Sequence, residues 1–263
     1  MLRELITYLT TPCSPHIRGL GYLYETIAMR GRFERNQVAW QPHLNNSRAF
    51  MLSAAERCRN KKKIVILGSG LLLDVPLAEL STLFHEVVLL DVVCLPDVRK
   101  QIRTFNNVKF FEHDVTGITE RLFRNRQSRI PELPDSAPAS ASLYEHADMV
   151  VSLNVLSQIW VIPRDYALTH LRGLQEDQVE DWCAQLVAAH YAFLRLLPCD
   201  VCLVADTEFT KRDRAGRIFS KGSTIAGLVL PAPEATWTWN IVPPGEDDQF
   251  ASKELKVGGW NFF

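Results

Sequence analysis

A short glycine segment follows the first strongly apolar run of the chain, and an acid ends the second. Gly68-Ser69-Gly70 comes directly after 64–67, and Asp91 closes 87–90, 21 residues after Gly70. Glycines lack a side chain, so backbone N–H groups can approach a ligand closely where a helix starts. A carboxylate at this spacing is suited to accept hydrogen bonds from ribose hydroxyls. The pattern predicts a site for an adenosine-containing ligand.

The elements that must position these residues follow a repeating pattern. From residue 63 onward, apolar runs typical of buried strands alternate with helical patterns. The expected strands are 64–67, 87–90, 108–111, 148–153 and 201–205, and the expected helices are 71–83, a segment ending near 105, and 175–196. This alternation favours a parallel sheet with crossover helices. We therefore expect an α/β domain with a doubly wound, mostly parallel sheet.

The two ends of the chain have a different character. Residues 1–60 carry helical patterns, which predicts a helical N-terminal cap or lid in front of an α/β domain at 61–263. After residue 207, strand-like runs replace long helices, at 217–219, 225–230, 236–242 and 253–257, with a hairpin turn at 214–216. The last two of these runs are expected to form an antiparallel strand pair that closes the sheet.

Composition narrows the possible functions. The chain has 263 residues, 47% of them hydrophobic, and a formal charge of -1. This supports a sizeable core and disfavours nucleic acid as a partner, because duplex binding needs clustered cations. No apolar run has membrane-spanning length and the N-terminus lacks the apolar centre of a signal peptide, so we expect a cytoplasmic protein without a membrane partner. Six scattered cysteines favour reduced thiols, and Cys199 and Cys202 are interpreted as core residues, with no metal site expected.

Two further segments extend the glycine and acid pattern in order along the chain. His113-Asp114-Val115-Thr116 follows the third expected strand, and Asn154 ends the fourth. Together with the glycine loop and Asp91, they resemble the motifs of class I S-adenosylmethionine-dependent methyltransferases, over roughly residues 63–206. The resemblance implies S-adenosylmethionine as cofactor and methyl transfer as the reaction. The chain departs from the family's usual loop, because Leu72 stands where a third glycine is common and Ile66 where an acid often begins the motif.

The resemblance also implies roles for the motif residues. The glycine loop would lie beside the methionine part of the cofactor, Asp91 would hold the ribose, and the end of the fourth strand would face the transferred methyl group. The Asp114 carboxylate can accept from the adenine amino group while the Val115 N–H donates to a ring nitrogen. Strand alternation turns His113 away, so it is interpreted as structural. The expected cofactor-binding residues are Gly68, Ser69, Gly70, Asp91, Val92, Asp114, Val115 and Asn154.

Catalytic candidates are fewer, because in-line methyl transfer mainly requires alignment of the acceptor with the sulfonium. Asn154, and Gln158 four residues later on the following helix, would orient a substrate but cannot deprotonate one. Asp206, with Glu208 nearby, is expected at the carboxyl end of the fifth strand, either as an acid-base group or as the cap of a turn. His43, in the N-terminal lid, would transfer a proton while Trp40 stacks on the substrate; alternatively the two are a helix cap and a packing anchor.

Three functions remain open from the sequence. The first is a methyltransferase acting on a small molecule, with a protein side chain as the second choice of acceptor. The second is a nicotinamide-dependent oxidoreductase, which would share the glycine loop and Asp91, although a third glycine and a Tyr-x-x-x-Lys pair are absent. The third is a non-catalytic accessory protein on a degenerate methyltransferase fold, which Leu72 and Ile66 favour. The acceptor and the oligomeric state are left undetermined.

Overall fold

One mixed β-sheet runs through the protein. The computed structural model describes residues 2–128, 131–137, 141–246 and 251–262. Within them, eight strands form a sheet of order β3-β2-β1-β4-β5-β8-β7, with β6 paired to β5. The neighbours from β3 to β5 are parallel, and β6, β7 and β8 are joined to the sheet by antiparallel pairing. The strands are β1 (Lys63–Leu67), β2 (Glu86–Asp91), β3 (Val108–Glu112), β4 (Met149–Leu153), β5 (Asp200–Arg212), β6 (Ile218–Ser223), β7 (Ala235–Val242) and β8 (Ser252–Phe262).

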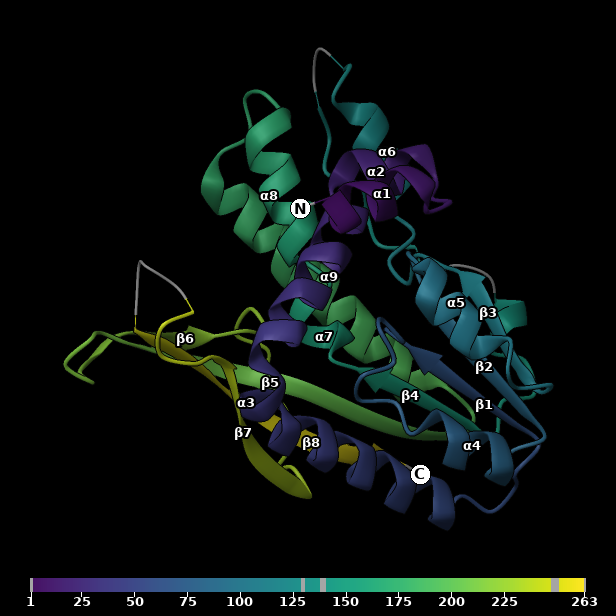
Figure 1. Cartoon of the computed structure of the whole chain (residues 1–263). Coiled ribbons are helices and arrows are strands. Elements are labelled where there is room, and N and C mark those ends of the chain that lie inside the picture. Colours follow the sequence, from purple (N-terminus) through teal and green to yellow (C-terminus); the bar gives the residue numbers. More distant parts are fainter. Residues whose placement is uncertain (1, 129–130, 138–140, 247–250, 263) are drawn as a thin grey trace.

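Helices cover both faces of this sheet. They are α1 (Leu2–Thr10), α2 (Pro15–Leu20), α3 (Tyr22–Arg57), α4 (Leu77–Leu83), α5 (Pro96–Ile102), α6 (Thr119–Asn125), α7 (Val155–Gln158), α8 (Val161–His170) and α9 (Glu176–Leu196), with a 3-10 turn at Ala141–Leu143. Figure 1 shows α1, α2 and α6 grouped at one end of the molecule, and α3 running from that group along the antiparallel strands. In the part of the chain that the structure describes, no helix combines the length and apolar character needed to cross a bilayer.

The strand residues alternate between the two helical layers, as the period of two along a strand requires. In β1, Ile64 and Ile66 belong to the core beneath α3, α4 and α5, whereas Val65 and Leu67 belong to the core shared with α9. All four side chains are fully buried. Burial on both faces is typical of a parallel sheet between two helical layers. The predicted α/β fold class, including the antiparallel pair formed by β7 and β8, is confirmed.

The N-terminal region is helical, as predicted, but most of it forms one long helix. Helix α3 spans 36 residues. Asn36 within it has non-helical backbone angles, and Pro42 also lies inside the helix. Its apolar side packs mainly on β7, where the Trp40 ring meets the Trp239 ring edge-on at 5.2 Å. The Trp40 indole N–H donates to the Ile241 carbonyl oxygen at 3.0 Å. The two ends of the chain therefore pack against each other.

Three sequence expectations were wrong in their extent. The helix expected from residue 71 starts only at Leu77, because Pro76 restricts the residue before it and leaves 71–76 as a loop. The expected strand at 225–230 is a turn, in which Ala226 and Gly227 have positive φ. Strand β5 does not end near 205; it continues to Arg212 because β8 and β6 pair with its extension on either side.

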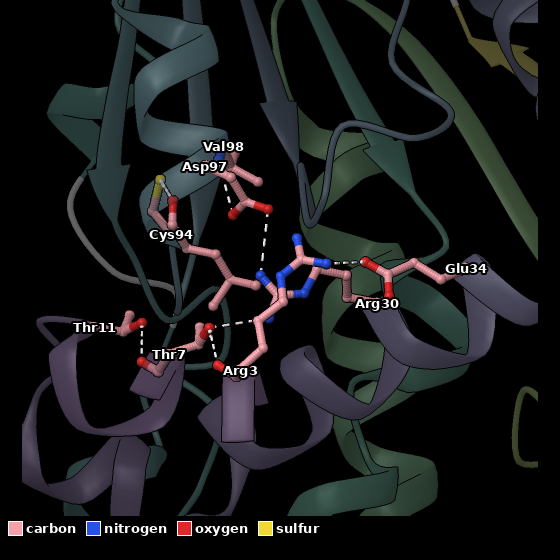
Figure 2. A network of polar contacts seen from close by, with 9 residues as sticks. Arg3, Thr7, Thr11, Arg30, Glu34, Cys94, Asp97 and Val98 are labelled. Atoms are coloured by element: carbon pink, nitrogen blue, oxygen red, sulfur yellow. Dashed lines mark hydrogen bonds and ion pairs between the residues drawn. The ribbon is translucent and has the colours of Figure 1, made fainter. Parts of the chain in front are cut away.

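Arg30 connects the N-terminal helices to the α/β layer. Figure 2 shows its guanidinium between helices α1 and α5. It donates to Thr7 Oγ1 at 3.1 Å and to Asp97 Oδ2 at 3.3 Å, and only 11% of its side chain is exposed. The nearby pair of Arg3 and Glu34 is also in Figure 2, but its side chains are 69% and 47% exposed. Arg30 is therefore the better candidate for fixing α1 and α3 relative to α5.

Replacing Arg30 by methionine should lower the free energy of unfolding by about 1 kcal/mol, because a mostly buried, charge-assisted link is lost while the aliphatic stem remains. Urea denaturation at pH 7 measures this change. Arg3→Met is the matched control and should change stability by less than about 0.5 kcal/mol, because its ion pair is exposed. Equal effects of the two variants would contradict the assignment of Arg30 as the link.

Candidate functional site

A cavity of about 270 Å³ lies at the carboxyl edge of the parallel strands. Its walls come from the loop after β1, the ends of β2, β3 and β4, the start of α7, and two more distant elements, α3 and β7. Ligands of open α/β sheets bind at this edge, where the order of the strands reverses. The reversal here falls at β1, which has β2 on one side and β4 on the other. The glycine loop follows β1 directly and forms the floor of the cavity.

Gly68 is held in close contact with the end of β4. Its φ is +75°, and a Cβ there would lie 2.7 Å from the Leu153 carbonyl oxygen and 2.5 Å from a methyl carbon of Val155. Gly70 has a φ of +49° and no such obstruction. Leu72, at the third-glycine position, has a φ of 60°, so the backbone keeps a glycine-like conformation although the residue is leucine. The left-handed backbone conformation of Leu72 costs about 1–2 kcal/mol. Burial of its apolar side chain offsets this cost.

Asp91 binds the glycine loop directly. Its Oδ2 accepts the Gly70 N–H at 2.7 Å, and its Oδ1 accepts the Val92 N–H, also at 2.7 Å. Burial raises the pKa of this carboxyl, and the backbone N–H groups oppose that rise. Each carboxylate oxygen has a second lone pair, so Asp91 can still accept from a ligand in the cavity that it lines.

Asp114, after β3, also accepts hydrogen bonds from nearby backbone N–H groups. Its Oδ1 accepts the Thr116 N–H and its Oδ2 accepts the Thr119 N–H, both at 2.9 Å, which secures the start of α6. Asp114 and Val115 line the cavity, and so does His113. Strand alternation predicts that His113 points away from the site. The residue nevertheless lines the cavity, and its Nε2 forms a hydrogen bond with the Tyr144 hydroxyl at 2.9 Å. Burial lowers the pKa of His113.

Asp74 and Asn154 meet on the other side of the glycine loop. The Asn154 Nδ2 group donates to Asp74 Oδ2 at 3.0 Å, and both residues line the cavity. Asn154 has a φ of 55°, and its Oδ1 is buried without a partner among the described residues. Burial raises the pKa of Asp74 to about 6. The Arg48 guanidinium donates to the neighbouring Leu73 carbonyl, which holds this loop against α3.

His43 has its tautomer fixed by Trp237. The Trp237 indole N–H donates to His43 Nδ1 at 3.0 Å. In the neutral ring the proton is therefore on Nε2, which is buried and has no partner in the described part of the chain. The imidazole also stacks on Trp239 with ring centroids 4.1 Å apart, and burial lowers its pKa to about 3. A neutral His43 that already carries a proton on Nε2 is a hydrogen-bond donor, not the proton acceptor expected from the sequence.

Asp206 and Glu208 lie away from the cavity. Both fall inside the extended β5, so the expected position at a strand end was wrong. Asp206 is buried, accepts the Ser157 hydroxyl at 2.5 Å, and has its pKa raised by burial. Glu208 bridges Lys221 and Lys256 at 2.9 and 3.1 Å. These contacts support structural roles for both acids.

The polar lining also includes Tyr22, Glu25, Thr26, Thr116 and Gln158. Gln158 was expected near the site, but Tyr22 and Asp74 were missed. Burial and the charges of Asp114 and Asp91 raise the pKa of Tyr22, which places the first turn of α3 next to both acids. Asp74 is the first acid after the glycine loop, a signal that the expected helix at 71–83 obscured. For Tyr22 no local sequence signal exists, since the cavity reaches it only through tertiary packing.

The order of the strands identifies the fold. Parallel strands in the order β3-β2-β1-β4-β5 are followed by antiparallel β8 and β7, and the cavity lies at the carboxyl edge. This is the class I methyltransferase fold. The resemblance found in the sequence motifs is therefore confirmed at the level of the fold.

Solved structures with similar folds include several methyltransferases. An O-methyltransferase family protein from Burkholderia thailandensis is 16% identical with a TM-score of 0.36, and the similarity covers 69% of this chain and 42% of that one, less than half its length. The N-methyltransferase NodS from Bradyrhizobium japonicum, in complex with S-adenosylhomocysteine, is 9% identical over 83% of this chain and 86% of its own, with a TM-score of 0.37. The 1,6-didemethyltoxoflavin-N1-methyltransferase of Burkholderia thailandensis is 12% identical over 90% and 89%, with a TM-score of 0.33.

No protein-family model and no curated protein sequence matches the chain. With TM-scores this low among the solved structures, the reaction and the acceptor have to be inferred from the site of this chain itself.

Gly68→Ala should destabilise the protein by about 2 kcal/mol more than Gly216→Ala, measured by urea denaturation. Both glycines have a φ near +75°, but a Cβ at Gly216 meets nothing within 4 Å, whereas at Gly68 it meets backbone. The difference between the variants therefore isolates the close contact of β1 with β4. Equal costs would show that the loop can move away from β4 and that the contact is not a constraint.

His43 should stay neutral, with its proton on Nε2, from pH 8 down to pH 5, as measured by the ¹⁵N chemical shifts of the imidazole. In Trp237→Phe the pKa should rise, because Nδ1 no longer faces an N–H donor. Protonation of His43 near pH 6.5 in the unaltered protein would instead show a solvated ring that is available for proton transfer.

Proposed function

We propose that this chain is an S-adenosylmethionine-dependent methyltransferase whose acceptor is a small molecule. The observation that carries the proposal is the glycine loop. It is pressed against β4 at Gly68, bound to the Asp91 carboxylate through the Gly70 N–H, and exposed to a cavity at the carboxyl edge of the sheet. A loop of this form permits close approach of a ligand to the backbone without a phosphate cradle.

The residues present fit the cofactor. The remaining lone pairs of Asp91 would accept from the ribose hydroxyls, with Val92 beside them, while Asp114 and Val115 would bind the adenine edge. Gly68 and Gly70 would lie against the methionine part, and Asn154 near the methyl group. Ser69, expected beside them, is buried outside the cavity lining. When bound, S-adenosylmethionine would supply a methyl group on a sulfonium centre for in-line displacement. Asn154 and His43 line the cavity, and their buried Oδ1 and Nε2 atoms have no hydrogen-bond partner among the described residues, as expected where a ligand supplies one.

The residues of α3 and β7 would close the acceptor side of the cavity. Trp40, Leu44 and Trp239 form its apolar wall and would exclude water from the nucleophile. His43, as an Nε2–H donor, would orient the acceptor, and Asn154 would orient it from the opposite side. An acceptor of small size is favoured, because the cofactor would already take up most of this cavity of about 270 Å³.

Calorimetric titration with S-adenosylmethionine, S-adenosylhomocysteine and NADH tests the cofactor. We expect micromolar binding of the first two and at least a tenfold loss in Asp91→Ala, because the ribose then loses its charged acceptor. Asp206→Asn is the control, since that buried acid lies outside the cavity lining and should leave the affinity unchanged.

Thermal denaturation of each variant separates lost binding from lost folding. Binding of NADH alone would replace the methyltransferase proposal with an oxidoreductase. Binding of none of the three ligands by the folded protein would favour a non-catalytic accessory role.

A further inference from the structure

The charges around the cavity favour a cationic ligand. Among the described residues, the lining contains the carboxyl groups of Glu25, Asp74, Asp91 and Asp114, and neither lysine nor arginine. The two histidines of the lining do not offset these charges, because burial lowers the pKa of each and leaves both neutral at pH 7. An anionic acceptor would therefore be repelled by the negative charges of the lining, and this repulsion is strong where the dielectric constant is low.

Asp74 differs from the other three acids in the kind of partner it has. Asp91 and Asp114 accept backbone N–H groups of their own turns, and Glu25 pairs with Arg32 at 3.4 Å. In the described part of the chain, Asp74 forms no ion pair with a lysine or arginine, and its Oδ2 accepts the Asn154 amide at 3.0 Å. The Asp74 backbone N–H and the charge of nearby Arg48 offset part of the desolvation of this carboxylate, and a bound cation would offset more of it.

Asp74 and Asn154 both line the cavity, and both carry hydrogen-bond acceptor atoms. Because a carboxylate only accepts, the Asn154 NH₂ group must face Asp74, which leaves Asn154 Oδ1 as an acceptor with no partner in the described part of the chain. An ammonium group carries N–H donors and no acceptor, so its donors match the Asp74 carboxylate and Asn154 Oδ1. A hydroxyl would supply only one donor, and a carboxylate none.

The position of the pair places it on the acceptor side of the sheet. Asp91 and Asp114 follow β2 and β3, on one side of β1, whereas Asn154 follows β4 on the other. His43 and Trp239, from α3 and β7, also line the cavity and enclose it from elements outside the parallel strands. An ammonium group bound at Asp74 is therefore separated from the adenosine part of the site by the glycine loop.

We propose that Asp74 and Asn154 bind the ammonium group of a small amine, so that the chain methylates nitrogen; this rests on the proposed function. Before transfer, the bound ammonium gives one proton to the Asp74 carboxylate. The freed lone pair on nitrogen forms the N–C bond as the C–S bond breaks, and the electrons of the broken bond remain on the sulfur of S-adenosylhomocysteine. The product is a methylammonium ion, and Asp74 releases its proton to solvent.

The test compares three ligands of one shape and different charge: benzylamine, benzyl alcohol and benzoate. Calorimetry on the full chain, with and without saturating S-adenosylhomocysteine, should show benzylamine binding at least tenfold more tightly than the other two. Asp74→Asn should remove this preference while S-adenosylhomocysteine binds within twofold of its original affinity. Asn154→Ala should weaken benzylamine binding, and mass spectrometry should detect N-methylbenzylamine with the unaltered protein only in the presence of S-adenosylmethionine.

The controls separate the competing explanations. Asp206→Asn removes another buried acid that lies outside the lining and should leave the benzylamine preference intact. A melting temperature for Asp74→Asn at or above that of the unaltered protein excludes misfolding as the cause of a loss. Benzyl alcohol or benzoate binding as tightly as benzylamine would overturn the proposal.

Two further outcomes distinguish this inference from the proposed function. If Asp74→Asn weakens S-adenosylhomocysteine tenfold, Asp74 binds the amino group of the cofactor and the acceptor assignment is overturned. If the unaltered protein binds no S-adenosylhomocysteine, both the methyltransferase function and the proposed N-methylation are contradicted. An Asp74-dependent preference for benzylamine would in that case still support the ammonium site itself.

Discussion

The close contact between the ends of β1 and β4 is the constraint on which the site depends. Because Gly68 has no Cβ, the chain can leave β1 against the Leu153 carbonyl and turn across the sheet edge. From that point the loop brings Gly70 to the Asp91 carboxylate on one side and continues to Asp74 beside Asn154 on the other. A single backbone approach thus determines where both the proposed adenosine half and the proposed acceptor half of the cavity lie.

Several local costs are concentrated around this contact. Leu72 and Asn154 have left-handed backbone angles, Asp74 is a desolvated acid, and His43 has a buried N–H without a partner in the described chain. The surrounding core tolerates these costs because β1 is buried completely on both faces. Such costs are expected at functional sites, since a sequence selected for stability alone would remove them.

Local patterns predicted the strands and the glycine loop well, because strong apolar runs bounded by turns specify parallel strands with little help from tertiary structure. The motif acids Asp91 and Asp114 were found for the same reason. Asp74 was missed because a helical pattern covered a loop that Pro76 interrupts, and Asp206 was misplaced because the sequence does not show where an antiparallel extension ends. The tautomer of His43 depends on a tryptophan in a distant strand, which no local pattern reveals.

The part of the cavity wall formed by α3 and β7 joins two segments that are far apart in the sequence and are therefore synthesised at different times. His43 bonds a tryptophan 194 residues later in the chain, and Trp40 bonds a carbonyl 201 residues later. Helix α3 therefore leaves the ribosome long before β7 exists to cover its aromatic side. Contacts of such high sequence separation slow folding, and in the interval the exposed tryptophan and leucine side chains of α3 are open to association with other chains. The arrangement that encloses the cavity in the native protein thus leaves the aromatic side of α3 uncovered until β7 has been synthesised.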